Sequence, residues 1–327
     1  MKYRTFGRLG WKVSQIGFGA WQIGALEWPT QQDDDSLAAL HTALDLGCNF
    51  IDTARVYGNG RSERLIAKVL RERKSDGVYV ATKIPPCLPG DWPPSPYETV
   101  EDRYPERHVR QKLEESLREL QTDCIDLVQI HTWSMGWNDD PRPLLLLQRL
   151  QQEGKLRGIG LSTPEHDQNS VVPIIQAGLI DSVQVIYNLF EQEAQAALFP
   201  AAAKNNVAVI VRVPLDESGL SGKLKTATAF ANGDFRRKYF AGDRLERTVH
   251  RVENIKETIA GEEPNVVTAA LKFALKPPVS TVIPGIRNRR QAEMNCGEVG
   301  DAEPMSDELE CKLRGHYWRR SFWYAGK

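Results

Sequence analysis

The sequence predicts an α/β protein, a single (β/α)8 (TIM) barrel over residues 1–327 with an N-terminal hairpin and extended βα loops. Eight short apolar runs, each followed by a stretch of helical periodicity, favour a parallel sheet closed into a ring. The length of 327 residues suits eight such units once a few loops are extended. An open doubly wound sheet is the alternative, but the first βα turn, GFGAWQIG, lacks the GxGxxG spacing of a dinucleotide fold.

The elements are expected in a regular order. A hairpin over 3–14, with Gly10 near its turn, comes first. The expected strands are 15–20, 49–54, 78–84, 124–131, 157–162, 182–188, 207–214 and 280–286. Helical patterns occupy 35–47, 61–74, 106–121, 143–157, 170–179, 193–206 and 265–278. In KLEESLREL and LLLLQRLQQ the apolar residues recur every three or four positions, as a helix facing a core requires.

Three regions exceed a minimal barrel. Residues 85–106 are rich in proline, which forbids a regular helix and predicts a long, partly extended loop. Residues 215–265 follow the seventh strand and contain a charged helical run at 244–259. The tail, 307–327, is dense in aromatic residues and arginine. Because barrel active sites are built from βα loops, these regions bear on substrate choice.

The composition excludes several classes of protein. A formal net charge of -1 and the absence of a basic tract argue against a nucleic-acid partner. The sequence contains no run of eighteen apolar residues, so we expect no membrane span. The N-terminus lacks the apolar core of a secretory signal. The 5 cysteines are widely spaced, so we expect reduced thiols in a cytoplasmic protein and no metal site.

Four side chains are predicted to meet at one end of the barrel, because they follow consecutive strands: Asp52, Tyr57, Lys83 and His131. A free phenol titrates near 10, but a neighbouring ammonium stabilises the phenolate. Tyr57 could then donate a proton to a carbonyl oxygen, while Asp52 holds Lys83 and His131 orients the carbonyl. The alternative is a structural one, in which Asp52 and Lys83 form an ion pair that closes the barrel and the two rings are separate packing residues.

The chain resembles the aldo-keto reductase superfamily along most of its length. The resemblance is carried by FGRLGWKVSQIGFGAWQIG, NFIDTARVYGNGRSERLIAKVL, ATK, DLVQIH, GLS, QVIYN, RVPLDESGLSGK and STVIPGIRNRRQAEMN. It implies a barrel that binds NADP(H) in an extended pose without a Rossmann fold. It also implies that Tyr57 is the general acid, that Lys83 and Asp52 tune it, and that His131 orients the carbonyl.

The resemblance further implies the cofactor contacts. Ser162 and Gln184 match residues that bind the nicotinamide carboxamide, and Gly19, Ala20 and Trp21 form the turn that approaches nicotinamide and substrate. The loop over the pyrophosphate would include Pro214, Leu215, Ser221 and Lys223. The adenosine end would take Gly285, Arg287, Gln291 and Asn295, with Arg289 and Arg290 as further candidates for the 2′-phosphate. The arginines favour NADP(H) over NAD(H), although Gly285 stands where one branch of the family has a lysine.

Arg212 departs from the family pattern, which commonly has an aromatic residue stacking on the nicotinamide after the seventh strand. A guanidinium plane can also stack on a ring, and its charge should disfavour the oxidised, positively charged nicotinamide. The alternative is that Arg212 turns toward a phosphate or toward an acidic partner, Asp216 or Glu217. We expect Trp21 and Trp133, with Tyr57 and His131, to contact the substrate. Further aromatic candidates for the pocket are Trp92, Trp137, Trp318, Phe322 and Trp323.

These observations predict an NADP(H)-dependent oxidoreductase that reduces small aldehydes or ketones, including sugars, to alcohols. Oxidation of a sugar or alcohol by NAD(P)⁺ is the first alternative, since one tetrad serves both directions. A binding protein similar to the potassium-channel β-subunits is the second; it would call for an N-terminal extension, whereas this chain starts close to the hairpin. A non-catalytic cofactor-binding protein is a third. The substrate, the reaction direction and the oligomeric state do not follow from the sequence.

Overall fold

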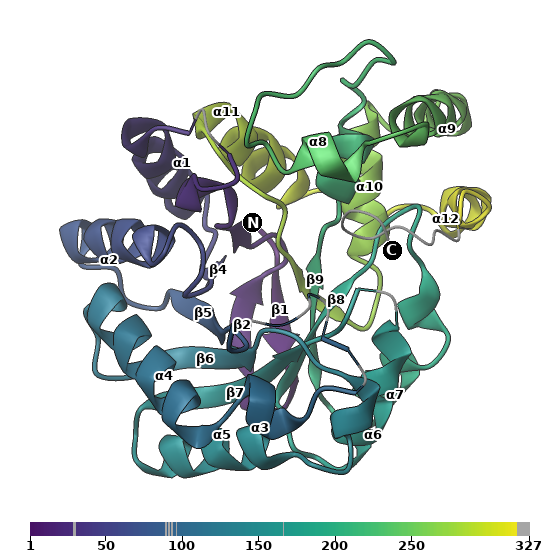
Figure 1. The fold of residues 1–327 in the computed structure, drawn as a ribbon. Helices are drawn as coiled ribbons and strands as arrows, with labels where there is room; N and C mark the ends of the chain where they lie inside the picture. The colour runs from purple at the N-terminus through teal and green to yellow at the C-terminus, as the bar shows by residue number, and fades with distance from the viewer. Residues whose placement is uncertain are drawn as a thin grey trace.

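A computed structural model gives the fold of residues 1–28, 31–88, 90, 92, 94–95, 97–165 and 167–318. Eight parallel strands stand at the centre and helices surround them (Figure 1). The strands run in sequence order around the sheet: β3 (Phe18–Gly19), β4 (Phe50–Asp52), β5 (Tyr79–Ile84), β6 (Ile125–Ile130), β7 (Leu156–Ser162), β8 (Ser182–Ile186), β9 (Ala208–Arg212) and β10 (Val279–Val282). The predicted order of strands is confirmed.

Bridges between the first and last strands complete the ring. Ile16 pairs with Val282, and Gly19 pairs with Gly285, both in parallel orientation. The Gly17 amide donates to the Val282 carbonyl at 2.9 Å, and the Gly19 amide donates to the carbonyl of Pro284 at 3.0 Å. These contacts give the expected (β/α)8 barrel, in which the carboxyl ends of all eight strands open on one face.

The helices lie outside the ring and follow the expected order (Figure 1). Their bounds are α1 (Asp33–Asp45), α2 (Arg61–Arg73), α3 (Val100–Arg103), α4 (Glu106–Leu120), α5 (Arg142–Gln152), α6 (Val172–Gln176), α7 (Leu198–Lys204), α8 (Arg236–Tyr239), α9 (Arg244–Thr258), α10 (Val266–Ala274), α11 (Arg289–Ala292) and α12 (Asp307–Arg314). A π-helix, Glu293–Val299, continues directly from α11.

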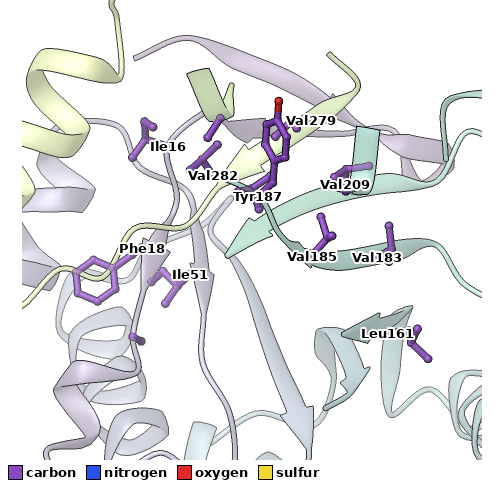
Figure 2. Packing of buried hydrophobic residues seen from close by; sticks show 14 of the residues in the cluster. Ile16, Phe18, Ile51, Leu161, Val183, Val185, Tyr187, Val209, Val279 and Val282 are labelled. Carbon is purple, nitrogen blue, oxygen red and sulfur yellow. The ribbon is translucent and has the colours of Figure 1, made fainter. Parts of the chain in front are cut away.

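Apolar side chains fill the space between the strands and the helices. Figure 2 shows Ile51 of β4 and, from the neighbouring strands β7, β8 and β9, Leu161, Val183 and Val209. Tyr187, just after β8, stacks on Phe273 of α10 with ring centroids 5.4 Å apart. All of these side chains are buried, and truncation of one large aliphatic residue in such a core typically costs about 2–5 kcal/mol.

The hairpin predicted at the N-terminus closes the amino end of the barrel. It consists of β1 (Tyr3–Phe6) and β2 (Trp11–Ser14), and Gly10 adopts a left-handed φ of 70° between them. Phe6 and Trp11 pack on Phe50 and other residues at the amino ends of the barrel strands. The open face of the barrel is therefore the opposite one, where the predicted site lies.

Two expectations about the extended regions were incomplete or wrong. The proline-rich loop does contain one helical turn, α3, because it lies between Pro96 and Pro105 and because Thr99 forms a capping box with Asp102. The tail forms α12, and Trp318 after it packs edge-on against Phe190 in the segment that follows β8, where it does not border the cavity at the carboxyl ends of the strands. Phe322 and Trp323 lie outside the described residues. No helix within the described ranges has the length and apolar character that a membrane crossing requires.

Candidate active site

A cavity of about 970 Å³ opens at the carboxyl ends of the barrel strands. Its walls come from the turns and loops that follow seven of the strands, including the long segments after β5 and β9, and from Gln184 within β8. Polar side chains meet at one end of the cavity, where Asp52 and Lys83 are buried and Tyr57 and His131 are half-buried, and mostly charged side chains meet at the other end. We call these the catalytic end (Asp52, Tyr57, Lys83 and His131) and the phosphate end (Glu217, Arg236, Arg287 and Asn295).

Lys83 is the centre of the catalytic end. Its Nζ donates to Asp52 Oδ2 at 2.5 Å, to the Thr53 carbonyl at 2.7 Å and to the Tyr57 hydroxyl at 3.3 Å. The side chain is 1% exposed. Burial lowers the pKa of the Lys83 ammonium, while the neighbouring Asp52 carboxylate opposes that shift. The predicted juxtaposition of carboxylate, ammonium and phenol is therefore present in the structure.

Asp52 is fixed by two glutamines as well as by Lys83. Its Oδ1 accepts from Gln129 Nε2 at 3.1 Å and from Gln184 Nε2 at 2.7 Å. Gln184 also donates to Gln129 at 3.2 Å. Because these residues lie on strands β4, β6 and β8, the carboxylate cannot turn without breaking contacts across the barrel. Gln184 borders the cavity, as expected, and in this structure its amide nitrogen serves Asp52.

Tyr57 lies in the tight turn between β4 and α2. Gly58 adopts a φ of 60°, and a Cβ there would collide with the Gly24 carbonyl. A Cβ on Gly24 would in turn lie 2.7 Å from the Tyr57 carbonyl carbon. These two glycines allow the turn to dock against the first βα loop, so that the phenol reaches Lys83.

His131 immediately follows β6 and faces Tyr57. The two rings meet edge to face with centroids 5.9 Å apart. Burial, reinforced by the positive charges of Lys83 and Arg212, holds the pKa of His131 well below its usual value. The imidazole is therefore neutral at ordinary pH. Its Nδ1 is buried and has no hydrogen-bond partner among the described residues.

The residues expected to bind the cofactor all border this one cavity. They are Gly19, Ala20, Trp21, Asp52, Ser162, Gln184, Arg212, Pro214, Leu215, Ser221, Lys223, Gly285, Arg287, Gln291 and Asn295. The cavity thus runs from the catalytic end to the start of α11. Arg289 and Arg290 do not border it; both are exposed, and Arg289 pairs with Glu293 at 3.0 Å.

Arg212, the last residue of β9, points toward the loop after β7. Its Nη2 donates to the Thr163 carbonyl at 3.2 Å and lies 3.5 Å from Glu165 Oε1. Glu165 is therefore an acidic partner of Arg212 that the sequence did not suggest. Of the two candidates that it did suggest, Glu217 lies close enough for the charge of Arg212 to act on its pKa, in the direction opposite to the larger effect of burial.

The loop after β9 is strained. Asp216, Glu217 and Ser218 have φ values of 48°, 52° and 84°, a conformation that costs non-glycine residues free energy and concentrates at functional sites. Burial, followed by repulsion from Asp216, raises the pKa of Glu217 to about 8. Glu217 is consequently protonated at neutral pH although it borders the cavity.

Two arginines converge on one indole at the phosphate end. The guanidinium of Arg236 lies 4.7 Å from the Trp28 ring centroid, and that of Arg287 lies 5.4 Å from it. Arg287 also donates from Nε to Gln31 at 3.0 Å. Burial and the nearby charge of Arg236 lower the pKa of Arg287. Arg236 is also paired with Asp234, with Nη2 2.7 Å from Oδ2, which compensates part of this positive charge. Guanidinium groups suit an anionic group such as a phosphate.

Gly285 and Asn295, the other positions predicted at the adenosine end, differ in whether they present a polar group to the cofactor. A Cβ on Gly285 would collide with the side-chain amide of Gln22. The close approach of Gln22 therefore accounts for a glycine at this position. Asn295 Oδ1 is buried and lacks a hydrogen-bond partner within the described part of the chain. An acceptor of this kind, at the wall of the cavity that Arg236 and Arg287 also line, fits the amino group of an adenine.

The expected aromatic wall is only partly present. Trp21 borders the cavity and donates from Nε1 to Glu27 at 2.6 Å, and Trp92 stands edge-on to the His131 ring at 5.0 Å. The structure does not bring Trp133 to the cavity: it is fully buried and packs on Trp137. Trp137 and Trp318 are likewise buried elsewhere. Trp133 fills the core because its loop folds inward after β6.

Comparison with known proteins identifies the family. The model of the Aldo/keto reductase family matches residues 15–308. The chain belongs to this family. It is therefore an NAD(P)H-dependent oxidoreductase whose substrates are small carbonyl compounds.

Individual relatives diverge in their cofactors and reactions. The chain is 30% identical to aldo-keto reductase YhdN of Bacillus subtilis over 85% of this chain and 82% of that protein. It is 27% identical to the NADH-specific methylglyoxal reductase of Escherichia coli over 84% and 86% of the two chains. The glycerol dehydrogenase AKR11B4 of Gluconobacter oxydans superposes with a TM-score of 0.77 at 26% identity, covering 96% and 94%.

Sequence reasoning missed several residues of the site. Gln129 lies near the end of β6, two positions before His131, so alternation of side chains could have placed both on the same side. Glu165 follows the end of β7 by three residues, but no motif marked it. Arg236 and Trp28 come from two distant loops, and their contact depends on loop conformations that no local pattern encodes.

Proposed function

We propose that this protein reduces an aldehyde or ketone to an alcohol with NADPH, with Tyr57 as the proton donor. The observation that carries the proposal is the set of contacts from the buried Lys83 Nζ to Asp52 Oδ2 at 2.5 Å and to the Tyr57 hydroxyl at 3.3 Å. When bound, the cofactor supplies a hydride from its nicotinamide ring to the carbonyl carbon.

The residues of the catalytic end provide the proton. The Tyr57 oxygen accepts a hydrogen bond from Lys83, so its own proton is not used in that contact. This proton passes from the Tyr57 hydroxyl to the carbonyl oxygen as the C–O double bond becomes a single bond. The ammonium stabilises the phenolate left behind, and Asp52 keeps the ammonium in place. Neutral His131 orients the carbonyl by a hydrogen bond.

Other residues along the cavity would bind the rest of the cofactor. Ser162 and Gln184 would hold the carboxamide, and the loop with Pro214, Leu215, Ser221 and Lys223 would cover the pyrophosphate. Arg287 is the favoured ligand of the 2′-phosphate, because it is half-buried at the cavity wall whereas Arg289 is exposed. This supports NADP(H) over NAD(H), in contrast to the NADH-specific relative.

Oxidation of an alcohol is the second candidate, because the glycerol dehydrogenase shares the fold over nearly the whole chain. The same four residues would act in reverse, with phenolate as the base. The whole chain is proposed to act as one barrel domain in either case.

Cofactor titration followed by turnover tests these proposals. Tryptophan fluorescence should be quenched by NADPH at lower concentration than by NADH. Rates over a panel of aldehydes, ketones and sugars with NADPH, and of polyols with NADP⁺, should then show the favoured direction. Binding of NADPH without turnover of any carbonyl or alcohol would contradict the proposed activity.

A further inference from the structure

The ion pair between Arg212 and Glu165 is buried at the wall of the cavity. Arg212 is 15% exposed and Glu165 is 2% exposed, with 3.5 Å between Nη2 and Oε1. Charges in a partly buried pair are screened less than exposed ones, so both the guanidinium and its carboxylate partner act on neighbouring groups. Since their formal charges cancel, the pair as a whole adds little net charge to the site.

Glu165 is held in a specific orientation. Its Oε1 also accepts a hydrogen bond from Trp92 Nε1 at 3.1 Å, and the Trp92 ring lies 5.0 Å from the His131 ring. Its Oε2 is buried and finds no hydrogen-bond partner in the described segments of the chain. A half-satisfied buried carboxylate costs free energy. Its attraction to Arg212 offsets that cost, which ties Glu165 to the charge of this one arginine.

The pair lies close to the reacting groups. The charge of Arg212 reaches both Lys83 and His131, where it contributes to lowering their pKa values. Hydride transfer to a carbonyl held by Tyr57 and His131 requires the nicotinamide to lie in the same part of the cavity. The oxidised nicotinamide ring carries a positive charge and the reduced ring is neutral. A bare guanidinium there would therefore disfavour the oxidised cofactor.

We propose that Glu165 is a positioning residue that neutralises Arg212, so that the guanidinium can face the cofactor without penalising its oxidised form. This inference rests on the proposed function, since it concerns the redox couple that the site binds. The sequence alone suggested that the cation of Arg212 would bias the couple toward the reduced form. The carboxylate of Glu165 is placed to cancel that bias.

The test is the ratio of the dissociation constants for NADP⁺ and NADPH, measured by fluorescence and calorimetry. Glu165→Gln keeps the shape of the side chain and removes its charge. We expect the ratio Kd(NADP⁺)/Kd(NADPH) to rise roughly tenfold in this variant, because the cation of Arg212 is exposed to the oxidised ring. The double variant Arg212→Gln/Glu165→Gln removes both charges, and its ratio should return to near the wild-type value.

A charge control separates local from general effects. Glu257→Gln removes one negative charge from the exposed face of α9 and should leave the ratio unchanged. If Glu165→Gln weakens both cofactor forms equally, or if the double variant keeps the raised ratio, the inference is wrong and Glu165 has a structural role alone. Absence of cofactor binding in the wild-type protein would instead overturn the proposed function itself.

Discussion

The two ends of the cavity are built in different ways. At the catalytic end, Asp52, Lys83 and Gln184 lie on strands, and their hydrogen bonds cross the barrel in a fixed register. At the phosphate end, Arg236 begins α8 within the long segment after β9, Arg287 lies in the short loop between β10 and α11, and the two guanidinium groups meet at the Trp28 ring. The first arrangement is dictated by the closed sheet, whereas the second depends on how loops of different length happen to fold. We therefore expect substitutions at the catalytic end to affect chemistry and folding together, and those at the phosphate end to affect binding.

Removal of the buried ammonium should have the largest effect. Lys83→Met leaves the Asp52 carboxylate buried without its counter-ion, which we expect to destabilise the fold by about 3–5 kcal/mol. Turnover should fall roughly 10²–10⁴-fold, since the phenol loses the charge that stabilises its conjugate base. Denaturant unfolding and steady-state rates measure the two effects.

A second variant distinguishes these effects. Lys83→Met/Asp52→Asn removes both charges, so much of the lost stability should return while turnover remains low. Recovery of turnover along with stability would indicate that the ion pair serves the fold alone, which is the structural interpretation that the sequence left open.

Removal of Arg287 should weaken the binding of NADPH and leave the binding of NADH nearly unchanged. We expect Arg287→Ala to weaken NADPH binding roughly tenfold, the typical loss of one hydrogen bond to a charged group, and to change NADH binding little. Arg289→Ala is the matched control, because this arginine is exposed and paired with Glu293. An equal loss for NADPH and NADH would exclude Arg287 as the ligand of the 2′-phosphate.

The strained loop predicts a smaller, pH-dependent effect. Below its pKa of about 8, Glu217 is neutral; above it, the carboxylate adds negative charge beside the expected pyrophosphate. The affinity for NADPH should therefore decline by a few-fold as the pH rises from 7 to 9. In Glu217→Gln the decline should disappear. Titration of both proteins across this range measures the difference, and parallel curves would count against a titrating Glu217.

Two tryptophans give the smallest effects on catalysis. Trp92→Phe should alter KM for aromatic aldehydes by a few-fold, because Trp92 borders the cavity beside His131. Trp133→Phe should leave KM unchanged and lower the free energy of unfolding by about 1–3 kcal/mol, since a buried indole is truncated. Thermal unfolding and initial rates measure these two effects. A change in KM without a loss of stability in Trp133→Phe would contradict the assignment of Trp133 to the core.

The same contrast explains what the sequence could predict. Alternating apolar runs identified the eight strands, and residues at strand ends, such as Lys83 and His131, could be placed on one face because parallel strands share an orientation. The pairing of Arg212 with Glu165 could not be predicted, because it depends on the conformation of the loop that follows β7. Trp133 was misplaced for a similar reason: its loop folds into the core, and neither composition nor spacing reports that direction.

The central claim is that Lys83 makes Tyr57 the proton donor. Tyr57→Phe removes one oxygen and keeps the ring, so single-turnover reduction of an aldehyde by bound NADPH measures the claim most directly. The account predicts that the rate falls by about 10² or more while the dissociation constant of NADPH changes less than about twofold. A variant that still reduces the aldehyde at a comparable rate would contradict it.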